Sequence, residues 1–353
     1  MDIVEARSFA RAGFLGNPSD GYFGKTVSFT FTAFRVDLRL TESARLRFVP
    51  GEVDDASFAS PAELVRDLRL YGYYGGIRML KAVSKRFFEY CTEHGIALPE
   101  RNFTAEYKIN IPRLVGLSGS SAICSAMLKA LMKFYGAELP LEDTPTICLE
   151  AERDELGIAC GLQDRVIQMY NGMVYMDFER GLVESTGHGR YERLYPGAAD
   201  PSSLNLYVAY DPARAEESGK AHKKVKRLFE QKNADILSAM SEFADIAERG
   251  RTAILGGDTA ALAKLVNANF DLRDRIFNVA EENRRMVMVA RSAGASAKFA
   301  GSGGAITGTF EDEAQYARLE KTLAGIGCRT LRPQIALASD ESAELASGGW
   351  RNS

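Results

Sequence analysis

A glycine- and serine-rich segment, Pro112–Ala122, has the residue types needed to bind an anion. It separates a segment with strand periodicity from one with helix periodicity. Glycines let the backbone turn tightly with its N–H groups pointing inward, and a helix start adds unpaired N–H groups and a positive dipole end. The segment therefore predicts a phosphate-binding loop, in which a serine hydroxyl could also reach a bound Mg²⁺. A simple N-cap turn is the alternative, but two glycines and three serines within six residues exceed what a cap needs.

A second loop ends in Gly-Lys-Thr and must be compared with a P-loop. The P-loop pattern requires glycine at position 19, where the chain has Ser19, and it must open a helix. Thr26 instead opens an alternating segment that is typical of a strand, so we exclude a P-loop. What remains is a loop with three charges, which either contact a ligand or are simply solvated on an ordinary turn: Arg11, Asp20 and Lys25.

A third glycine-rich turn, Lys298–Ala305, has the sequence Lys-Phe-Ala-Gly-Ser-Gly-Gly-Ala. Ile306 stands where the dinucleotide-binding pattern requires its last glycine, and no helix follows, so a dinucleotide fold is disfavoured. The turn is either a tight hairpin or a backbone wall close to a ligand.

Two carboxylates near the middle of the chain are candidate site residues. Glu152 lies in a charged run near the end of a predicted helix and is most simply a surface charge. Asp164 follows a glycine-containing bend and precedes an apolar helical pattern. It is therefore either an N-cap or a residue that points into a cleft, and the sequence leaves both interpretations open.

Periodicity predicts the elements that must position these residues. Alternation over 27–31, 36–40 and 103–111 predicts strands, whereas the spacing of Ile123, Met127, Leu131 and Phe134 predicts a helix over 120–134. Further segments predict helices over 61–90, interrupted at Gly72–Gly76, and over 145–156, and a strand over 172–178. The remaining predictions are a linker at 177–203, strands at 204–210, 297–300, 305–310 and 331–337, charged helices up to residue 293, and a helix at 311–326. The pattern is that of an α+β protein.

Composition excludes several classes of protein. The chain has 353 residues, of which 46% are hydrophobic, and 44 basic against 47 acidic residues give a net charge of −3, so nothing directs it to nucleic acid or an anionic membrane. The five cysteines form no CxxC pair and the three histidines are scattered, which disfavours zinc, a disulfide framework and a His-based triad. With neither a secretory signal nor a long apolar run, we expect reduced thiols and a cytoplasmic protein without a transmembrane helix.

The three motifs, taken in their order along the chain, resemble those of the GHMP kinase superfamily. Phe9 to Asp20 matches the pattern A-P-G-[RK]-x-x-L-x-G-E-H-x-D, Pro112–Ala122 matches P-x-x-x-G-L-[GS]-S-S-A, and Lys298–Ala305 matches the C-terminal glycine turn. Asn17-Pro18 stands where many members have Glu-His, and the second motif carries one extra residue. These departures, with strings such as GYYGGIRML and ELGIACGLQDRV, resemble the glucuronokinase subgroup from about Glu5 to Leu337.

This resemblance implies a two-domain α+β fold with ATP bound between the domains. A ribosomal-protein-S5-like domain would span 1–195 and carry the phosphate loop, and a ferredoxin-like domain would span 204–345. The implied activity is Mg²⁺-dependent transfer of the γ-phosphoryl group of ATP to the anomeric hydroxyl of D-glucuronate. Other sugars, such as galacturonate or galactose, and a non-catalytic ligand sensor are the alternatives. The partners would be ATP and a small sugar acid, and the oligomeric state stays open.

The resemblance also implies roles for individual residues. Asp164 matches the catalytic aspartate, and Arg11 would hold it ionised. Ser121 and Glu152 match the Mg²⁺ ligands, which changes the interpretation of Glu152 from a surface charge. The phosphate contacts would come from Gly116, Leu117, Ser118, Gly119, Ser120, Ser121 and Ala122, and the sugar contacts from Asp20, Gly301, Ser302, Gly303 and Gly304. The substrate carboxylate needs a cation, and the candidates, each alternatively a solvated charge, are Lys25, Arg78 and Arg165.

Overall fold

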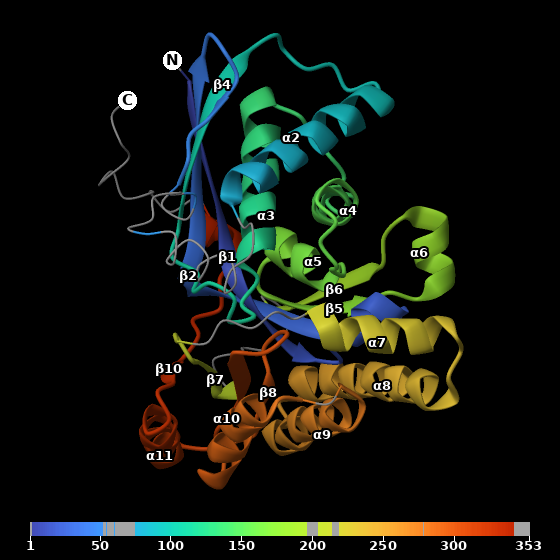
Figure 1. Ribbon diagram of the computed structural model, residues 1–353, viewed down its shortest axis with the longest axis vertical. Coiled ribbons are helices and arrows are strands. Elements are labelled where there is room, and N and C mark those ends of the chain that lie inside the picture. Colours follow the sequence, from blue (N-terminus) through green and yellow to red (C-terminus); the bar gives the residue numbers. More distant parts are fainter. Residues whose placement is uncertain are drawn as a thin grey trace.

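Two antiparallel-rich β-sheets with helices packed against them make up the structure, a computed structural model (Figure 1). It describes residues 2–51, 54, 60, 75–195, 204–213, 219–277 and 279–341. Every strand of the first sheet lies before residue 196 and every strand of the second lies after residue 205. The mixture of helices and mainly antiparallel sheets confirms the α+β class.

The first sheet is organised around one long strand. In the described part of the chain its order is β3-β4-β2-β5-β6, with β1 also paired to β2. The strands are β1 (Ile3–Leu15), β2 (Lys25–Ser43), β3 (Arg47–Phe48), β4 (Asn102–Ile109), β5 (Met173–Asp177) and β6 (Arg190–Tyr195). The strands predicted at 27–31 and 36–40 are the two halves of β2, because the backbone stays extended between them.

Strand β1 carries Arg11, although the residue pattern at 3–15 does not predict a strand. Its residues from Ala6 to Leu15 are all buried, because α3 covers one side of the strand and elements of the second half cover the other. A strand that is covered on both faces lacks the alternation of apolar and polar residues by which strands are identified.

Helices of the first half cover one face of this sheet (Figure 1). They are α2 (Gly76–Glu93), α3 (Gly119–Tyr135), α4 (Thr144–Glu150), a π-helical turn (Ala151–Glu155) and α5 (Gln163–Tyr170). Helix α3 is buried along most of its length, so its N-terminus is fixed against the sheet. The helix predicted over 120–134 is confirmed. The helix predicted over 61–90 is confirmed from residue 76, whereas 61–74 lies outside the described residues.

The second sheet has the order β10-β7-β9-β8, and its strands contact two helices of the second half, at 259–277 and 313–324, whereas the helix at 234–256 packs on β2 of the first sheet (Figure 1). Its strands are β7 (Leu206–Tyr210), β8 (Lys298–Phe299), β9 (Ala305–Thr309) and β10 (Arg329–Leu331). The helices of the second half are α7 (Gly219–Glu230), α8 (Ala234–Gly256), α9 (Thr259–Phe277), α10 (Glu281–Ser292) and α11 (Glu313–Ala324). The third glycine turn connects β8 to β9, as the predicted hairpin requires.

Two predictions about the connections are wrong. The segment predicted as a linker at 177–203 contains α6 (Arg180–Thr186) and β6, which pairs with β5. The last predicted strand, 331–337, is shorter, since β10 ends at Leu331. The chain then returns to the first sheet, where the Ala336 N–H donates to the Thr30 carbonyl at 2.9 Å. One apolar cluster includes residues of both halves, whereas a second lies wholly within 207–328, so the division into 1–195 and 204–345 stays a proposal about folding units.

None of the five cysteines forms a disulfide in the structure. Within the described ranges, no helix combines the length and the apolar character that crossing a membrane demands.

Candidate active site

A cavity of about 440 Å³ lies where the three glycine-rich segments meet. Its walls come from both halves of the chain, so it forms only when the two sheets and their helices are assembled. It is lined by Arg11 at the end of β1 and Asn17, Pro18, Asp20 and Tyr22 of the loop that follows, by residues of 109–120, by residues of 158–165, and by Arg153, Lys226, Arg273, Gly301 and Ser302. The convergence of charged residues with backbone-rich loops in one concave region is typical of a binding site.

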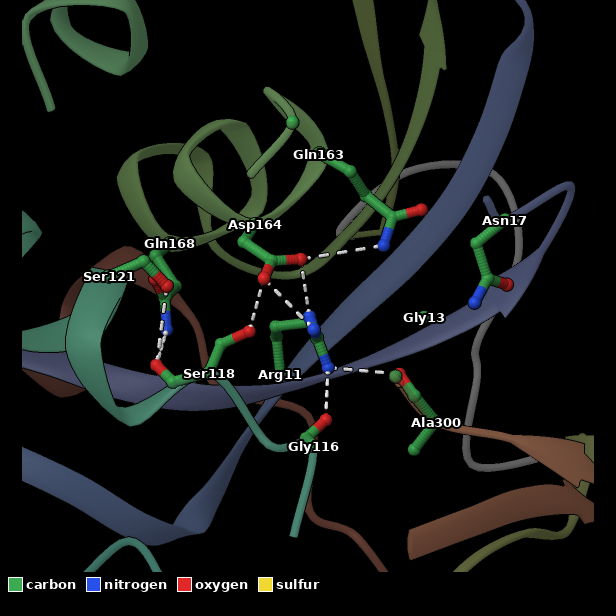
Figure 2. Close-up of polar contacts among 12 residues, drawn as sticks. Arg11, Gly13, Asn17, Gly116, Ser118, Ser121, Gln163, Asp164, Gln168 and Ala300 are labelled. Carbon is green, nitrogen blue, oxygen red and sulfur yellow. Dashed lines mark hydrogen bonds and ion pairs between the residues drawn. The ribbon is translucent and has the colours of Figure 1, made fainter. Parts of the chain in front are cut away.

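The Arg11 guanidinium joins four separate segments at this cavity (Figure 2). Its Nε and Nη2 donate to the two carboxylate oxygens of Asp164 at 2.6 and 2.9 Å. Its Nη1 donates to the Gly116 carbonyl at 2.6 Å and to the Ala300 carbonyl at 2.9 Å. One buried side chain therefore fixes the phosphate-loop candidate, the third glycine turn and Asp164 relative to β1.

Asp164 lines the cavity and is not the N-cap of a helix. It is the second residue of α5, whose N-cap position is Leu162, and its carboxylate accepts from Arg11 and not from a backbone N–H of that turn. Besides Arg11, it accepts a hydrogen bond from the Ser118 hydroxyl at 2.5 Å. Burial by itself raises the pKa of Asp164, but the charge and hydrogen bonds of Arg11 outweigh burial and hold that pKa well below its usual range. The group is therefore a carboxylate at neutral pH.

The glycine-rich segment opens α3 with an unusual backbone. Gly116 has φ 75° and Ser118 has φ 62°, both in the left-handed region. Gln168 holds this turn against β1, because its amide donates to the carbonyls of Phe9 at 3.1 Å and of Ser118 at 3.0 Å. Gly116, Leu117, Ser118, Gly119 and Ser120 line the cavity, whereas Ser121 and Ala122 are buried behind them. The start of α3 therefore lies at the cavity, where the unpaired N–H groups of a helix N-terminus can bind an anion.

The phosphate-loop candidate and the third glycine turn touch through their backbones. A Cβ added to Gly301 would lie 2.2 Å from the Gly116 carbonyl oxygen and 3.0 Å from Arg11 Nη1. A Cβ added to Gly116 would lie 2.6 Å from the Gly303 carbonyl oxygen. Glycine is therefore required at these positions by close approach.

We expect the Gly301→Ala variant to lose about a hundredfold in kcat/KM, because its methyl group must displace the phosphate-loop candidate by several tenths of an ångström or more. The measurement is steady-state kinetics together with the thermal midpoint. Gly256→Ala is the matched control, since a Cβ there meets nothing within 4 Å. Unchanged kinetics for Gly301→Ala would show that the contact between the two segments is dispensable.

Glu152 and Arg165 form a buried ion pair beside the cavity. The Arg165 Nε donates to Glu152 Oε2 at 2.8 Å, a second nitrogen of the same guanidinium contacts the same oxygen, and Nη1 donates to the Gly161 carbonyl at 2.9 Å. Glu152 is fully buried, so its interpretation as a surface charge is wrong. Because the Arg165 guanidinium is occupied by Glu152, it is poorly placed to serve as the cation for a substrate carboxylate.

The second oxygen of Glu152, Oε1, is buried without a hydrogen-bond partner. An orphaned carboxylate oxygen is a hard donor of the kind that Mg²⁺ takes, and Mg²⁺ keeps several waters and needs few protein ligands. Within the described ranges, no three His, Cys, Asp or Glu side chains gather into a metal-binding group. Ser121, the other predicted Mg²⁺ ligand, is also buried, and its hydroxyl donates to the Ser118 carbonyl at 3.3 Å.

The structure places some of the other predicted sugar-binding residues at the cavity and others away from it. Asp20, Gly301 and Ser302 line the cavity, and Gly303 and Gly304 lie behind them. Burial, together with the nearby charge of Asp164, raises the pKa of Asp20 to about 6. Lys25 is turned away, since its Nζ lies 2.6 Å from Glu248 and 3.6 Å from Asp177. Arg78, in the first turn of α2, is likewise absent from the cavity wall in the described part of the chain.

Three residues have contacts at this site that the sequence did not indicate. Gln163 lines the cavity and its amide lies 3.5 Å from Asp164 Oδ1. Lys298 is fully buried, and its Nζ donates to the Gly13 and Phe299 carbonyls, both at 2.7 Å, and to Asn17 Oδ1 at 2.5 Å. The Ser118 hydroxyl contacts Asp164 directly. The sequence contained one indication of these contacts. Lys298 lies in an apolar strand segment, and a buried ammonium group requires several hydrogen-bond acceptors.

Known proteins resemble this chain in sequence and in fold. Residues 78–172 match the family model described as the GHMP kinases N terminal domain. The chain is 45% identical over 309 residues to Glucuronokinase 1 of Arabidopsis thaliana, covering 86% of this chain and 84% of that protein. It is 46% identical over 311 residues to the Probable glucuronokinase 2 of the same plant, covering 86% and 83%. The solved structure of Lactococcus lactis galactokinase complexed with galactose superposes with a TM-score of 0.72 at 14% identity, covering 95% of this chain and 94% of that chain.

Proposed function

The chain belongs to the GHMP kinases and, among them, to the glucuronokinases, and from this membership we propose that it phosphorylates the anomeric hydroxyl of D-glucuronate. The family makes it a sugar kinase with ATP as the phosphoryl donor, as the resemblance of its motifs implied. The products would be D-glucuronate 1-phosphate and ADP. The proposal includes a reducing cytoplasmic compartment, which the absence of any disulfide among the five cysteines supports.

The observation that carries the proposal is the contact between Arg11, Asp164 and the phosphate-loop candidate at one cavity. Phosphoryl transfer involves little covalent participation by the protein, so catalysis depends on positioning and on charge stabilisation. The N–H groups at the start of α3 would hold the phosphates of ATP, and Asp164 would face the hydroxyl that attacks.

Asp164 would accept a hydrogen bond from the anomeric hydroxyl and take up its proton as the bond to phosphorus forms. Its lowered pKa makes it a weak base before transfer, so its first contribution is to orient the hydroxyl oxygen toward the γ-phosphorus. Arg11 would keep Asp164 ionised and offset negative charge that develops on the phosphoryl oxygens. Ser118, through its hydrogen bond to Asp164, would hold that carboxylate in one orientation.

Ser121 and Glu152 would hold Mg²⁺, which neutralises charge on the ATP phosphates when bound. The orphaned Oε1 of Glu152 supports this assignment. Arg165 would then balance the remaining negative charge of the Glu152 carboxylate inside the fold.

Asp20 would bind sugar hydroxyls in its ionised form. Because burial raises its pKa to about 6, the fraction of enzyme with a charged Asp20 increases as the pH rises through that value. We expect kcat/KM for the sugar to rise over the same interval in the wild type and this component to disappear in Asp20→Asn. Titration of the ATP phosphate, with a pKa of about 6, is common to both proteins, so the difference between their pH profiles isolates Asp20. Superimposable profiles would remove Asp20 from the sugar site.

The test of the proposed function is Mg²⁺-dependent ADP release with a panel of acceptors. The panel is glucuronate, galacturonate, glucose, galactose, mannose and mevalonate, each with and without chelator. We expect turnover with glucuronate to exceed that with the others. A higher kcat/KM for a neutral sugar would overturn the assignment of D-glucuronate while leaving a sugar kinase.

A further inference from the structure

The substrate carboxylate of the proposed reaction needs a cation, and the cavity wall offers few candidates. In the described chain, the basic residues on this wall are Arg11, Arg113, Arg153, Arg165, Arg273 and Lys226. Arg11 is paired with Asp164, Arg165 with Glu152, and Arg153 with Asp154. A cation whose charge is already neutralised inside the protein adds little attraction for an incoming anion.

The other two arginines have different tasks. Arg273 is buried, and its nitrogens donate to the carbonyls of Gly301 at 3.0 Å and Ser302 at 3.3 Å, so it supports the third glycine turn. Arg113 belongs to the phosphate-loop candidate itself. Lys226 is left: it is exposed, it lines the cavity, and it has no polar partner among the residues that the structure describes.

Helix α7 places Lys226 on the same side of the cavity as Asp20. Phe229 follows Lys226 by three residues and therefore lies on the same helix face. Its ring packs edge-on against Tyr22, with centroids 4.9 Å apart. Tyr22 and Asp20 belong to one short 3-10 helix, Ser19–Tyr22. The aromatic contact thus docks the Lys226 face of α7 onto the segment that carries Asp20.

The charge on α7 agrees with a role in attracting an anion. Lys224, Lys226 and Arg227 are all exposed on this helix, and Lys226 is the one among them that lines the cavity. When it is ionised, the Asp20 carboxylate on the same wall repels an acidic sugar, whereas Arg11 neutralises the charge of Asp164. An unpaired cation at this side would offset that repulsion and gains strength when the substrate excludes water from the cavity.

We propose that Lys226 binds the carboxylate of the sugar acid and so sets the preference for an acidic over a neutral sugar. This inference rests on the proposed function, since it assigns the substrate's charged group to one residue. The lysine ammonium is a point charge at the end of a flexible side chain. It can therefore bind a carboxylate without the fixed bidentate geometry of an arginine guanidinium. The contact is made to a part of the substrate remote from the reacting hydroxyl, so its loss acts mainly on KM.

The experiment compares D-glucuronate with D-glucuronamide, in which a neutral amide replaces the carboxylate. We expect Lys226→Met to lower kcat/KM for glucuronate about tenfold to a hundredfold, mostly through KM, as loss of a charge-assisted contact predicts. The kcat/KM for glucuronamide should change by less than about twofold, since glucuronamide has no carboxylate with which Lys226 could form an ion pair. Lys226→Arg should restore most of the loss, and KM for glucuronate should rise with salt in the wild type but not in Lys226→Met.

Lys224→Met is the matched control, because Lys224 is an exposed lysine on the same helix away from the cavity wall. It should behave as the wild type with both substrates. If the wild type phosphorylates glucuronate and Lys226→Met keeps the full preference for glucuronate over glucuronamide, this inference alone is overturned. A wild type that phosphorylates neutral sugars but not glucuronate would overturn the proposed function together with it.

Discussion

The Asp164→Asn variant is expected to lose about a hundredfold to ten-thousandfold in kcat, the range that a group handling the transferred proton contributes. The amide can still accept a hydrogen bond from the Ser118 hydroxyl, so the local geometry is largely kept. It can neither take up the hydroxyl proton nor neutralise Arg11. The KM for ATP should change little, because the phosphate-loop candidate is unaltered. Steady-state and single-turnover assays of ADP formation measure the effect.

Asp37→Asn is the control for this variant. Asp37 is also a partly buried carboxylate in an ion pair with an arginine of β1, Arg7, at 2.6 Å, but it lies away from the cavity. Its substitution should lower the thermal midpoint and leave kcat within about twofold, because Asp37 contributes no transition-state interaction. If Asp164→Asn retained kcat within the same limits while folded, Asp164 would have no part in proton transfer or in orienting the hydroxyl.

The second large effect is expected for Arg11→Gln, which should lose both activity and stability. Removing the guanidinium leaves the Asp164 carboxylate buried without its counter-charge, which destabilises a protein by about 3 to 5 kcal/mol. It also removes the common donor to the carbonyls of Gly116 and Ala300, so the two glycine segments are no longer joined through it. With Arg11 gone, burial raises the pKa of Asp164. The residual activity of Arg11→Gln should therefore increase with pH as Asp164 ionises. In the same pH range the wild type does not respond to Asp164, because Arg11 already keeps it ionised.

Arg7→Gln is the comparison for Arg11→Gln. Arg7 precedes Arg11 on β1, its side chain has the same 7% exposure, and it too pairs with an aspartate and a backbone carbonyl. Arg35 remains beside Asp37 at 3.0 Å, so a smaller loss of stability is expected. Chemical unfolding and kcat/KM are measured on both. Equal catalytic losses in the two variants would mean that Arg11 acts only through the stability of β1.

Local sequence chemistry identified the elements that begin or end at glycine, serine and alternating apolar residues. The phosphate-loop candidate, helix α3, strand β4 and the hairpin of β8 and β9 are where the pattern predicts them. Each depends on contacts within a few residues, namely a turn, a helix start or one covered face of a strand. The same reasoning missed β1, which is covered on both faces, and placed a linker where α6 and β6 lie, because glycine and proline also occur between short paired elements.

The pairing of charges was decided by the tertiary structure alone. Arg11 and Asp164 are 153 residues apart, and no local pattern links them; only the resemblance to a family suggested that they act together. Lys25 and Arg165 looked available for a ligand because each stands near a glycine-rich segment, yet they are occupied by Glu248 and Glu152. Lys226 had no distinguishing neighbour in the sequence and became a candidate only when α7 was seen to line the cavity.

The sequence by itself therefore determined the loops that can hold phosphate, the class of fold and, through its motifs, the family. These depend on backbone conformations that glycine and serine permit locally. The tertiary structure determined which charges are neutralised, which are buried and which face the cavity. Coulombic interactions and desolvation depend on distance and on the exclusion of water, and both are set by packing between segments far apart in the chain.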